Sequence, residues 1–196
     1  MPRYDTTTAL LVVDVQNDFA DPAGSLSVAG GERLVPIINR QIERARESGA
    51  VVVYTQDWHP ETTPHFQKDG GIWPVHCVMD TWGAELHPQL RVVGDVIRKG
   101  SAGEDGYSAF SMRDPESGDE MPTGLEAMLR ERGVRRVVIC GLATDYCVNA
   151  SAVDALQLGF ETVVLLEAIA AVNMARGDAE RALDTMADAG AELARS

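Results

Sequence analysis

The chain has 196 residues and a formal net charge of −13, with 30 acidic and 17 basic side chains. This length suits one well-buried domain, which we expect to span residues 1–196. The acidic balance argues against nucleic acid or an anionic membrane as a partner, because phosphate binding needs clustered Lys and Arg. We expect a cytoplasmic protein, since no apolar run approaches the roughly 20 residues of a membrane span and the three cysteines do not suggest a disulfide framework.

The first part of the chain predicts two strands separated by a helix. Residues 8–15 form a nearly continuous apolar run, typical of a central parallel strand, which Asp14 interrupts near its end. A helix is expected from about 32 to 48, with its apolar residues on one face, and a second strand at 50–55. Residues 56–90 show little periodicity but many Pro, Gly, His and Trp, and so long an irregular stretch is more often functional than idle.

The second part continues the alternation of strands and helices. Strands are expected at 92–98, 136–140, 161–166 and, in truncated form, 191–194; helices at 125–132, 178–189 and after Cys147; and a Gly-, Ser- and Asp-rich loop up to about Thr123. This alternation predicts an α/β fold of three layers, Rossmann-like, in which a predominantly parallel sheet carries helices on both faces.

Residues 141–147 connect the apolar strand at 136–140 to a helix and place Cys147 in the first helical turn. Thr144 or Asp145 can cap this helix. Unpaired backbone N–H groups and the positive end of the helix dipole favour a thiolate there and could hold an oxyanion. A lone Cys at a helix start is more often ordinary packing, so partners elsewhere in the chain must decide.

Asp14 and Lys99 also stand at the carboxyl ends of predicted strands, which converge on one crevice in a doubly wound sheet. An Asp after an apolar run is poorly solvated, which raises its pKa and suits it to proton transfer. Taken singly, Asp14 reads as a turn residue and Lys99 as a surface charge. With Cys147 they supply the nucleophile, proton carrier and orienting cation that amide hydrolysis through a thioester needs.

A second group of residues combines one carboxylate with three imidazoles. Asp57 and His59 are two residues apart at a strand end, so in extended backbone they point the same way. His65 and His76 follow in the next loop. This donor set suits one divalent metal ion, zinc in the first place, with manganese or iron as alternatives. His87, further along, is expected at the surface.

Five motifs resemble the nicotinamidase branch of the isochorismatase-like cysteine hydrolases. They are Val-Asp-Val-Gln-Asn-Asp-Phe (13–19), Asp-Trp-His-Pro (57–60), Trp-Pro-Val-His-Cys-Val (73–78), Arg-Lys-Gly (98–100) and Gly-Leu-Ala-Thr-Asp-Tyr-Cys-Val (141–148). The match runs in the expected order from about residue 8 to residue 170. Two features depart from the pattern: a long spacing between His59 and His65, and an acidic loop insertion at 111–122 that could alter substrate choice.

The resemblance implies a role for each matching residue. It implies a triad of Asp14, Lys99 and Cys147; metal ligands Asp57, His59, His65 and His76; an oxyanion hole of the Ala143 and Cys147 backbone amides; a cis peptide before Ala143; and a ring pocket walled by Phe19, Trp73 and Tyr107. For the three aromatic residues, the alternative is ordinary packing.

The implied activity is hydrolysis of nicotinamide to nicotinate and ammonia in NAD salvage, with pyrazinamide also accepted. The implied partner is a small amide, with no nucleic acid and no membrane, and a homo-oligomer is left open. Three alternatives remain: a related hydrolase of another amide or a carbamoyl group, an isochorismatase, and a non-catalytic metal-binding protein. The histidine-rich donor set argues against the first, the thiol at Cys147 against the second, and the intact triad against the third.

Overall fold

A six-stranded parallel sheet forms the centre of the computed structural model, which describes residues 3–195. The strands lie in the order β3-β2-β1-β6-β7-β8, and every neighbouring pair is parallel. Their bounds are β1 Thr8–Val13, β2 Val51–Asp57, β3 Asp95–Lys99, β6 Arg136–Leu142, β7 Glu161–Ala170 and β8 Glu192–Ala194.

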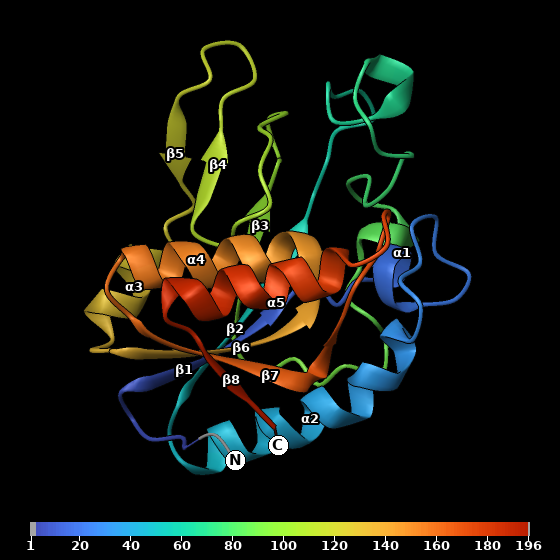
Figure 1. Cartoon of the computed structure of the whole chain (residues 1–196). Helices are drawn as coiled ribbons and strands as arrows, with labels where there is room; N and C mark the ends of the chain where they lie inside the picture. Colours follow the sequence, from blue (N-terminus) through green and yellow to red (C-terminus); the bar gives the residue numbers. More distant parts are fainter. Residues whose placement is uncertain (1–2, 196) are drawn as a thin grey trace.

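Helices cover both faces of this sheet (Figure 1). Helix α2 (Gly31–Glu47) lies on one face, and α3 (Leu125–Glu131), α4 (Asn149–Gln157) and α5 (Asp178–Ala189) lie on the other. Alternate residues of β1 explain the two layers: Leu10 packs into the apolar cluster on the α2 side, whereas Leu11 packs into the opposite cluster. The predicted three-layer α/β fold is therefore confirmed. No helix within residues 3–195 is long and apolar enough to cross a membrane.

The order in which strands are added to the sheet reverses at β1. Strands β2 and β3 follow on one side of β1, and β6, β7 and β8 on the other. In open α/β sheets, ligands bind outside the carboxyl ends of the strands at such a point. Asp14 directly follows β1, and a π-helical turn, Thr144–Val148, follows β6 and carries Cys147. The peptide bond between Leu142 and Ala143 is cis, as the resemblance implied.

Two local predictions near this point were wrong. The first strand ends at Val13 instead of residue 15, because Asp14 adopts a left-handed conformation with φ of 48°, which a strand cannot continue. Neither Thr144 nor Asp145 caps the helix in the described part of the chain. The Asp145 carboxylate instead accepts the N–H groups of Val172 and Asn173, at 2.9 and 2.7 Å.

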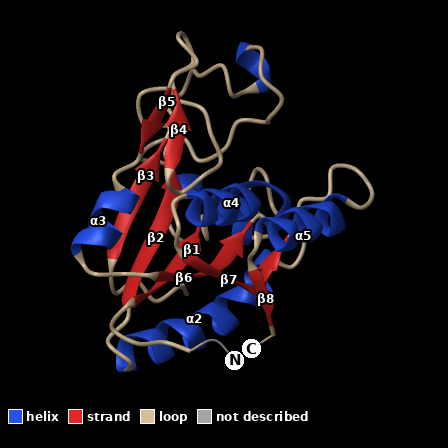
Figure 2. Ribbon diagram, turned by 60° about the vertical axis from the view of Figure 1, so that its left-hand side comes forward, coloured by secondary structure: helices blue, strands red, loops and turns tan. Residues whose placement is uncertain are grey.

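The two long irregular regions contain more order than the sequence suggested. The expected loop before Thr123 contains an antiparallel hairpin, β4 Ser111–Arg113 with β5 Glu120–Pro122. The stretch after β2 carries two 3-10 turns, η1 Gln67–Asp69 and η2 Trp82–Ala84, and η2 packs against the short helix α1 Asn17–Ala20. Figure 2 shows the hairpin and the η1 region rising at the same end of the molecule, above α4.

His87 was predicted at the surface but is buried. Its backbone N–H donates to the carbonyl of Val15, at 2.9 Å, which ties the end of the long stretch to the residue after Asp14. Its ring Nδ1 accepts the N–H of Gln89, at 3.3 Å. The prediction failed because an irregular segment gives no periodicity from which burial can be inferred.

Candidate active site

The ammonium group of Lys99 lies in the middle of a buried charged cluster. Its Nζ is 2.8 Å from Asp14 Oδ2, 3.0 Å from Asp57 Oδ1 and 3.7 Å from Cys147 Sγ. It also donates to the carbonyl oxygen of Tyr107, at 3.2 Å. The parallel register of β2 and β3 sets Asp57 directly beside Lys99. The structure thus brings the three predicted triad residues together and adds Asp57 to them.

Thr55 holds the Asp14 carboxylate. Its hydroxyl donates to Asp14 Oδ1 at 2.5 Å and accepts the Asp14 backbone N–H at 3.1 Å. Thr55 and Asp57 are two residues apart on β2, so they lie on the same face of the strand. Sequence reasoning missed Thr55, although a polar residue two positions before a candidate Asp in an apolar strand is a usable signal.

Asp14 and Asp57 both contact the Lys99 ammonium, but their pKa values shift in opposite directions. Burial raises the pKa of Asp14, and Lys99 opposes this shift without cancelling it. Burial would raise the pKa of Asp57 too, but Lys99 and the His59 ring hold it well below its usual range. Two neighbouring carboxyl groups with separated pKa values can take separate roles. Asp14 is suited to carry a proton, and Asp57 to remain a permanent anion.

The Cys147 side chain is a buried thiol within reach of a proton acceptor. Its Sγ and one oxygen each of Asp14 and Asp57 lie within 4.8 Å of one another. Burial raises the pKa of the thiol well above its ordinary value, and Lys99 lowers it only in part. The prediction that a helix start would favour the thiolate is therefore outweighed by burial. Attack by Cys147 requires its proton to pass to a neighbour, and Asp14 is suited to take it.

Three imidazoles gather next to this cluster. His59, His65 and His76 are all buried, and one nitrogen of each ring lies within 4.8 Å of the others. The rings of His59 and His65 stack with their centroids 4.8 Å apart. Asp57 Oδ2 is 3.8 Å from His59 Nε2, so Asp57 borders both the histidines and the Lys99 cluster. The four residues predicted as metal ligands are therefore neighbours.

The bonding of these rings fits a bound divalent ion. His76 Nδ1 donates to the Pro74 carbonyl, at 2.7 Å, which leaves Nε2 with its lone pair, and burial lowers the pKa of His76 to about 4. Neither nitrogen of His59 has a hydrogen-bond partner among residues 3–195, although both are buried. Unpaired buried nitrogens of this kind call for an ion or a ligand. Neutral imidazoles with one carboxylate are suitable ligands for zinc, manganese or iron.

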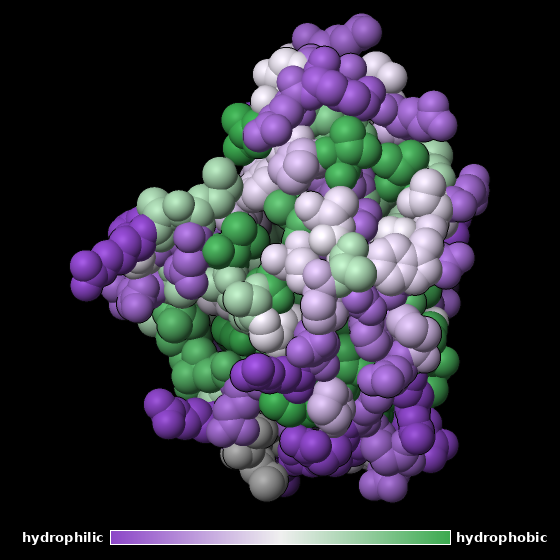
Figure 3. Space-filling model, turned by 90° about the vertical axis from the view of Figure 1, so that its right-hand side faces the viewer, coloured by the Kyte–Doolittle hydropathy of each residue, from purple (hydrophilic) through white to green (hydrophobic). Residues whose placement is uncertain are grey.

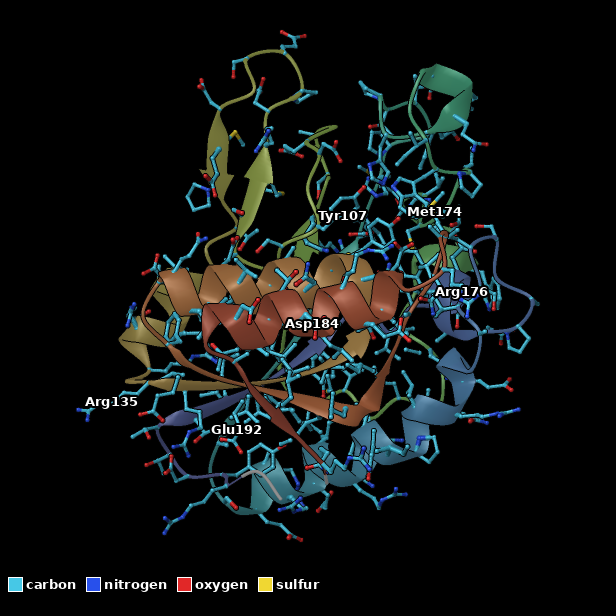
Figure 4. The ribbon with its side chains drawn as sticks, viewed as in Figure 1. Tyr107, Arg135, Met174, Arg176, Asp184 and Glu192 are labelled. Atoms are coloured by element: carbon cyan, nitrogen blue, oxygen red, sulfur yellow. The ribbon has the colours of Figure 1, made fainter. Side chains whose placement is uncertain are left out.

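A pocket of about 380 Å³ lies between the histidines and Cys147. Phe19, Trp73 and Tyr107 line it, as the resemblance implied, and Trp73 Nε1 donates to the Tyr107 hydroxyl at 3.0 Å. Tyr107 lies above α4, toward the histidine loop (Figure 4). The remaining lining residues are Leu26, Val28, Asp57, His65, His76, Leu142, Ala143, Tyr146, Cys147 and Val172.

Apolar side chains dominate the pocket wall, and several of them were not predicted from the sequence. Tyr146 crosses the Trp73 ring nearly at right angles, with centroids 4.8 Å apart. Leu26 and Val28 come from the irregular segment after α1, which showed no periodicity. Outside the pocket, the face in Figure 3 mixes hydrophobic with hydrophilic side chains.

Comparison with known proteins places this geometry in a family. The model of the isochorismatase domain matches residues 8–196. The chain belongs to the isochorismatase family. Among its relatives, the nicotinamidase of Escherichia coli (strain K12) is 36% identical over 94% of this chain and 93% of its own. The nicotinamidase/pyrazinamidase of Mycobacterium tuberculosis is 40% identical over 94% and 97%.

Solved structures of isochorismatase-family proteins share this fold. The pyrazinamidase of Pyrococcus horikoshii in complex with zinc superposes with a TM-score of 0.85 at 40% identity, covering 97% of this chain and 99% of that one. PnC1 from L. infantum in complex with nicotinate gives 0.88 at 39% identity, covering 99% and 96%. The family resemblance inferred from the motifs is confirmed.

The structure shows what two further residues of the motifs, Gly100 and Gln16, contribute to the site. Gly100 has φ of +79°, and a Cβ there would lie 2.7 Å from His59 Nδ1, so the glycine after Lys99 makes room for the imidazole. Gln16 clamps the end of β2: its side-chain nitrogen donates to the Asp57 carbonyl at 2.7 Å, and its oxygen accepts the Asp57 N–H at 2.8 Å.

Proposed function

We propose that this isochorismatase-family protein is a nicotinamidase, which hydrolyses nicotinamide to nicotinate and ammonia and accepts pyrazinamide, in NAD salvage. The observation that carries the proposal is the buried contact of Lys99 with Asp14 and Cys147 beside a pocket that reaches His65 and His76. The names of the relatives support the choice of substrate, since they include nicotinamidases at 36% and 40% identity over nearly the whole chain.

In the first half of the reaction, Cys147 Sγ attacks the carboxamide carbon while its proton passes to Asp14. The oxyanion that forms accepts hydrogen bonds from the backbone amides of Ala143 and Cys147. Asp14 then gives the proton to the amide nitrogen, the C–N bond breaks, and ammonia leaves. A thioester on Cys147 remains.

In the second half, water attacks the thioester carbon and gives its proton to Asp14. The C–S bond breaks, Asp14 returns this proton to Cys147 Sγ, and the carboxylic acid leaves. The raised pKa of Asp14 suits it to these transfers, because its carboxyl group holds a proton more readily than an exposed Asp does. Burial alone would lower the pKa of Lys99, but Asp14 and Asp57 raise it well above its usual value, so it remains a cation throughout.

Asp57, His59, His65 and His76 would hold the metal ion. When bound, the ion supplies a coordination position for the pyridine nitrogen of the substrate, which orients the ring. The aromatic walls contributed by Phe19, Trp73 and Tyr107 would enclose that ring, as aromatic side chains do in many ligand sites. Zinc is the proposed ion, because a structural relative contains it.

Ammonia release from a panel of amides tests this function. Nicotinamide and pyrazinamide carry a nitrogen at the ring position that the metal would bind, whereas benzamide has the same ring size and amide but lacks it. Metal-loaded protein should release ammonia rapidly from the first two and slowly from benzamide. Removing the metal with a chelator should abolish the difference, and adding it back should restore it.

Two outcomes would contradict the proposal. Equal rates with nicotinamide and benzamide would remove the ring nitrogen from substrate recognition. Release only from a carbamoyl compound would keep Asp14, Lys99 and Cys147 as the hydrolytic residues but assign the pocket to another substrate.

A further inference from the structure

Asp105 is the partner of one candidate metal ligand and has no role in the reaction above. Its Oδ1 lies 2.8 Å from His65 Nδ1. The same oxygen accepts the backbone N–H of Gly106 at 2.9 Å, which orients the carboxylate. The His65 side chain is 6% exposed, whereas that of Asp105 is 56% exposed, so a half-solvated carboxylate reaches inward to a buried ring.

This contact decides which nitrogen of His65 is available as a ligand. A carboxylate can only accept, so the proton of the neutral ring lies on Nδ1 and the lone pair on Nε2. Without Asp105, the ring could carry its proton on either nitrogen. Carboxylates that bond the second nitrogen of a ligating histidine orient the ring and raise its basicity.

The backbone of Asp105 is itself fixed by the hairpin. Its N–H donates to the Arg113 carbonyl at 2.8 Å, and its carbonyl accepts the Arg113 N–H at 2.6 Å. Arg113 ends β4, which pairs with β5. A two-way backbone bridge therefore runs from the insertion at 111–122 to Asp105, and from the Asp105 carboxylate to His65.

The position of the insertion agrees with such a supporting role. Over the described part of the chain, none of the residues that line the pocket of about 380 Å³ comes from 111–122. The insertion thus meets the site through Asp105 and through Met112, whose Sδ accepts the Gly100 N–H at 3.4 Å, and not through the substrate pocket. His65 itself lies on an irregular loop, after the long spacing that separates it from His59.

We propose that Asp105 is the positioning residue of the metal site, that it fixes the His65 ring with Nε2 free to bind the ion, and that the β4–β5 hairpin holds Asp105 in place. This inference rests on the metal site proposed above. It assigns the acidic insertion to metal retention and not to substrate choice.

Metal binding without any substrate tests the inference. Wild-type protein is stripped of metal and titrated with Zn²⁺ against a chromogenic chelator, and with Co²⁺ while the visible d–d absorption is recorded. Asp105→Ala should raise the Kd for Zn²⁺ about 10- to 100-fold and shift the Co²⁺ bands. Asp105→Asn should recover most of this loss, because its amide oxygen can still accept the Nδ1 proton of His65.

Glu104→Gln is the matched control, since it removes the same charge one residue away, from a carboxylate that bonds only the N–H of Ala102, at 2.8 Å, among the described contacts. It should bind metal like wild type. Circular dichroism should show that all variants are folded.

Wild-type affinity in Asp105→Ala, or equal losses in the Ala and Asn variants, would overturn the positioning role, and so would the absence of metal binding in wild type. If the variants show the expected order of metal affinities but the metal-loaded wild type does not hydrolyse nicotinamide, the proposed function is refuted and this inference stands.

Discussion

The Lys99 cluster and the histidine group are adjacent, but the chain builds them in different ways. Asp14, Lys99 and Cys147 are far apart in sequence, and each stands at or just after the end of a strand in one sheet. His59, His65 and His76 lie within a short stretch, and the last two are on irregular backbone. In the first group, strand register sets the geometry. In the second, individual contacts do.

The Lys99 cluster and the histidine group share Asp57, although different parts of the chain hold the two groups in place. Asp57 ends β2 beside Lys99 and also approaches His59. The strand side is held by backbone pairing along β1, β2 and β3. The loop side depends on Asp105 at His65, on the Pro74 carbonyl at His76, and on the missing side chain of Gly100 at His59. Changes to the two supports should therefore have separable effects.

The largest expected effect is loss of the nucleophile. Cys147→Ala should lower kcat at least about 10⁴-fold, because no other group can form the thioester. Folding and metal content should not change, since the histidines are supported independently. Cys140→Ala is the matched control: it removes a buried cysteine from β6 of the same sheet and should leave turnover nearly intact. Retained activity in Cys147→Ala, measured as ammonia release, would remove the assignment.

Loss of the shared cation should damage stability as well as activity. Lys99→Met leaves Asp14 and Asp57 buried without their ammonium, which should cost about 3–5 kcal/mol in urea unfolding. The cost should grow as pH rises above the ordinary Asp value of 3.8, because Asp14 ionises in the unfolded chain, whereas the buried Asp14, whose pKa is raised, retains its proton.

Two control variants show whether the stability loss in Lys99→Met comes from leaving buried carboxylates without their cation or simply from losing a positive charge. Arg132→Met breaks an exposed pair with Asp95, whose side chains are 42% and 49% exposed, and should cost less than about 1 kcal/mol. The double variant Asp14→Asn with Lys99→Met should regain part of the stability but none of the activity. Equal stability losses in Lys99→Met and Arg132→Met would contradict the central position of the buried cation.

The fold was predictable because regular elements carry periodic patterns. The apolar run before Asp14 and the one-sided helix before β2 gave the layers correctly. Asp14, Lys99 and Cys147 could be placed near one another from the same logic, because strand ends converge in such a sheet. Thr55 was within reach of this reasoning but was missed.

The loop side could not be worked out in the same way. The positions of His65 and His76 depend on the path of an irregular chain, so the sequence could group them with Asp57 and His59 only by their chemistry and by the family resemblance, and not by geometry. Asp105 gave no signal at all, because it is one of many acidic residues in a polar loop and its partner is 40 residues away. The prediction that His87 is exposed was wrong because it too lies in an irregular segment without periodicity.

A glycine pair tests the loop side on its own. Gly100 and Gly103 both have positive φ, +79° and +89°, so Ala at either position should cost about 1–2 kcal/mol. Only at Gly100 would the new Cβ meet His59, 2.7 Å from Nδ1, whereas at Gly103 nothing lies within 4 Å. Gly100→Ala should therefore weaken metal binding, and Gly103→Ala should not. Matching metal affinities in the two variants, measured by chelator competition, would show that His59 is not constrained by Gly100.

The smallest expected effect concerns the hydrogen bond that tunes the proton carrier. Thr55→Val keeps the branched shape but removes the hydroxyl that donates to Asp14 Oδ1, and that bond lowers the pKa of Asp14. Without it the pKa of Asp14 should rise further. The acid limb of kcat/KM, where Asp14 gains an inactivating proton, should then move to higher pH, while the rate at the optimum falls less than about tenfold. Metal content measured at each pH separates protonation of Asp14 from loss of the ion as the cause of the shift. If Asp14 controls the acid limb, the rate falls while the metal stays bound. If the ion is lost instead, metal content falls together with the rate, which would contradict the role of Thr55.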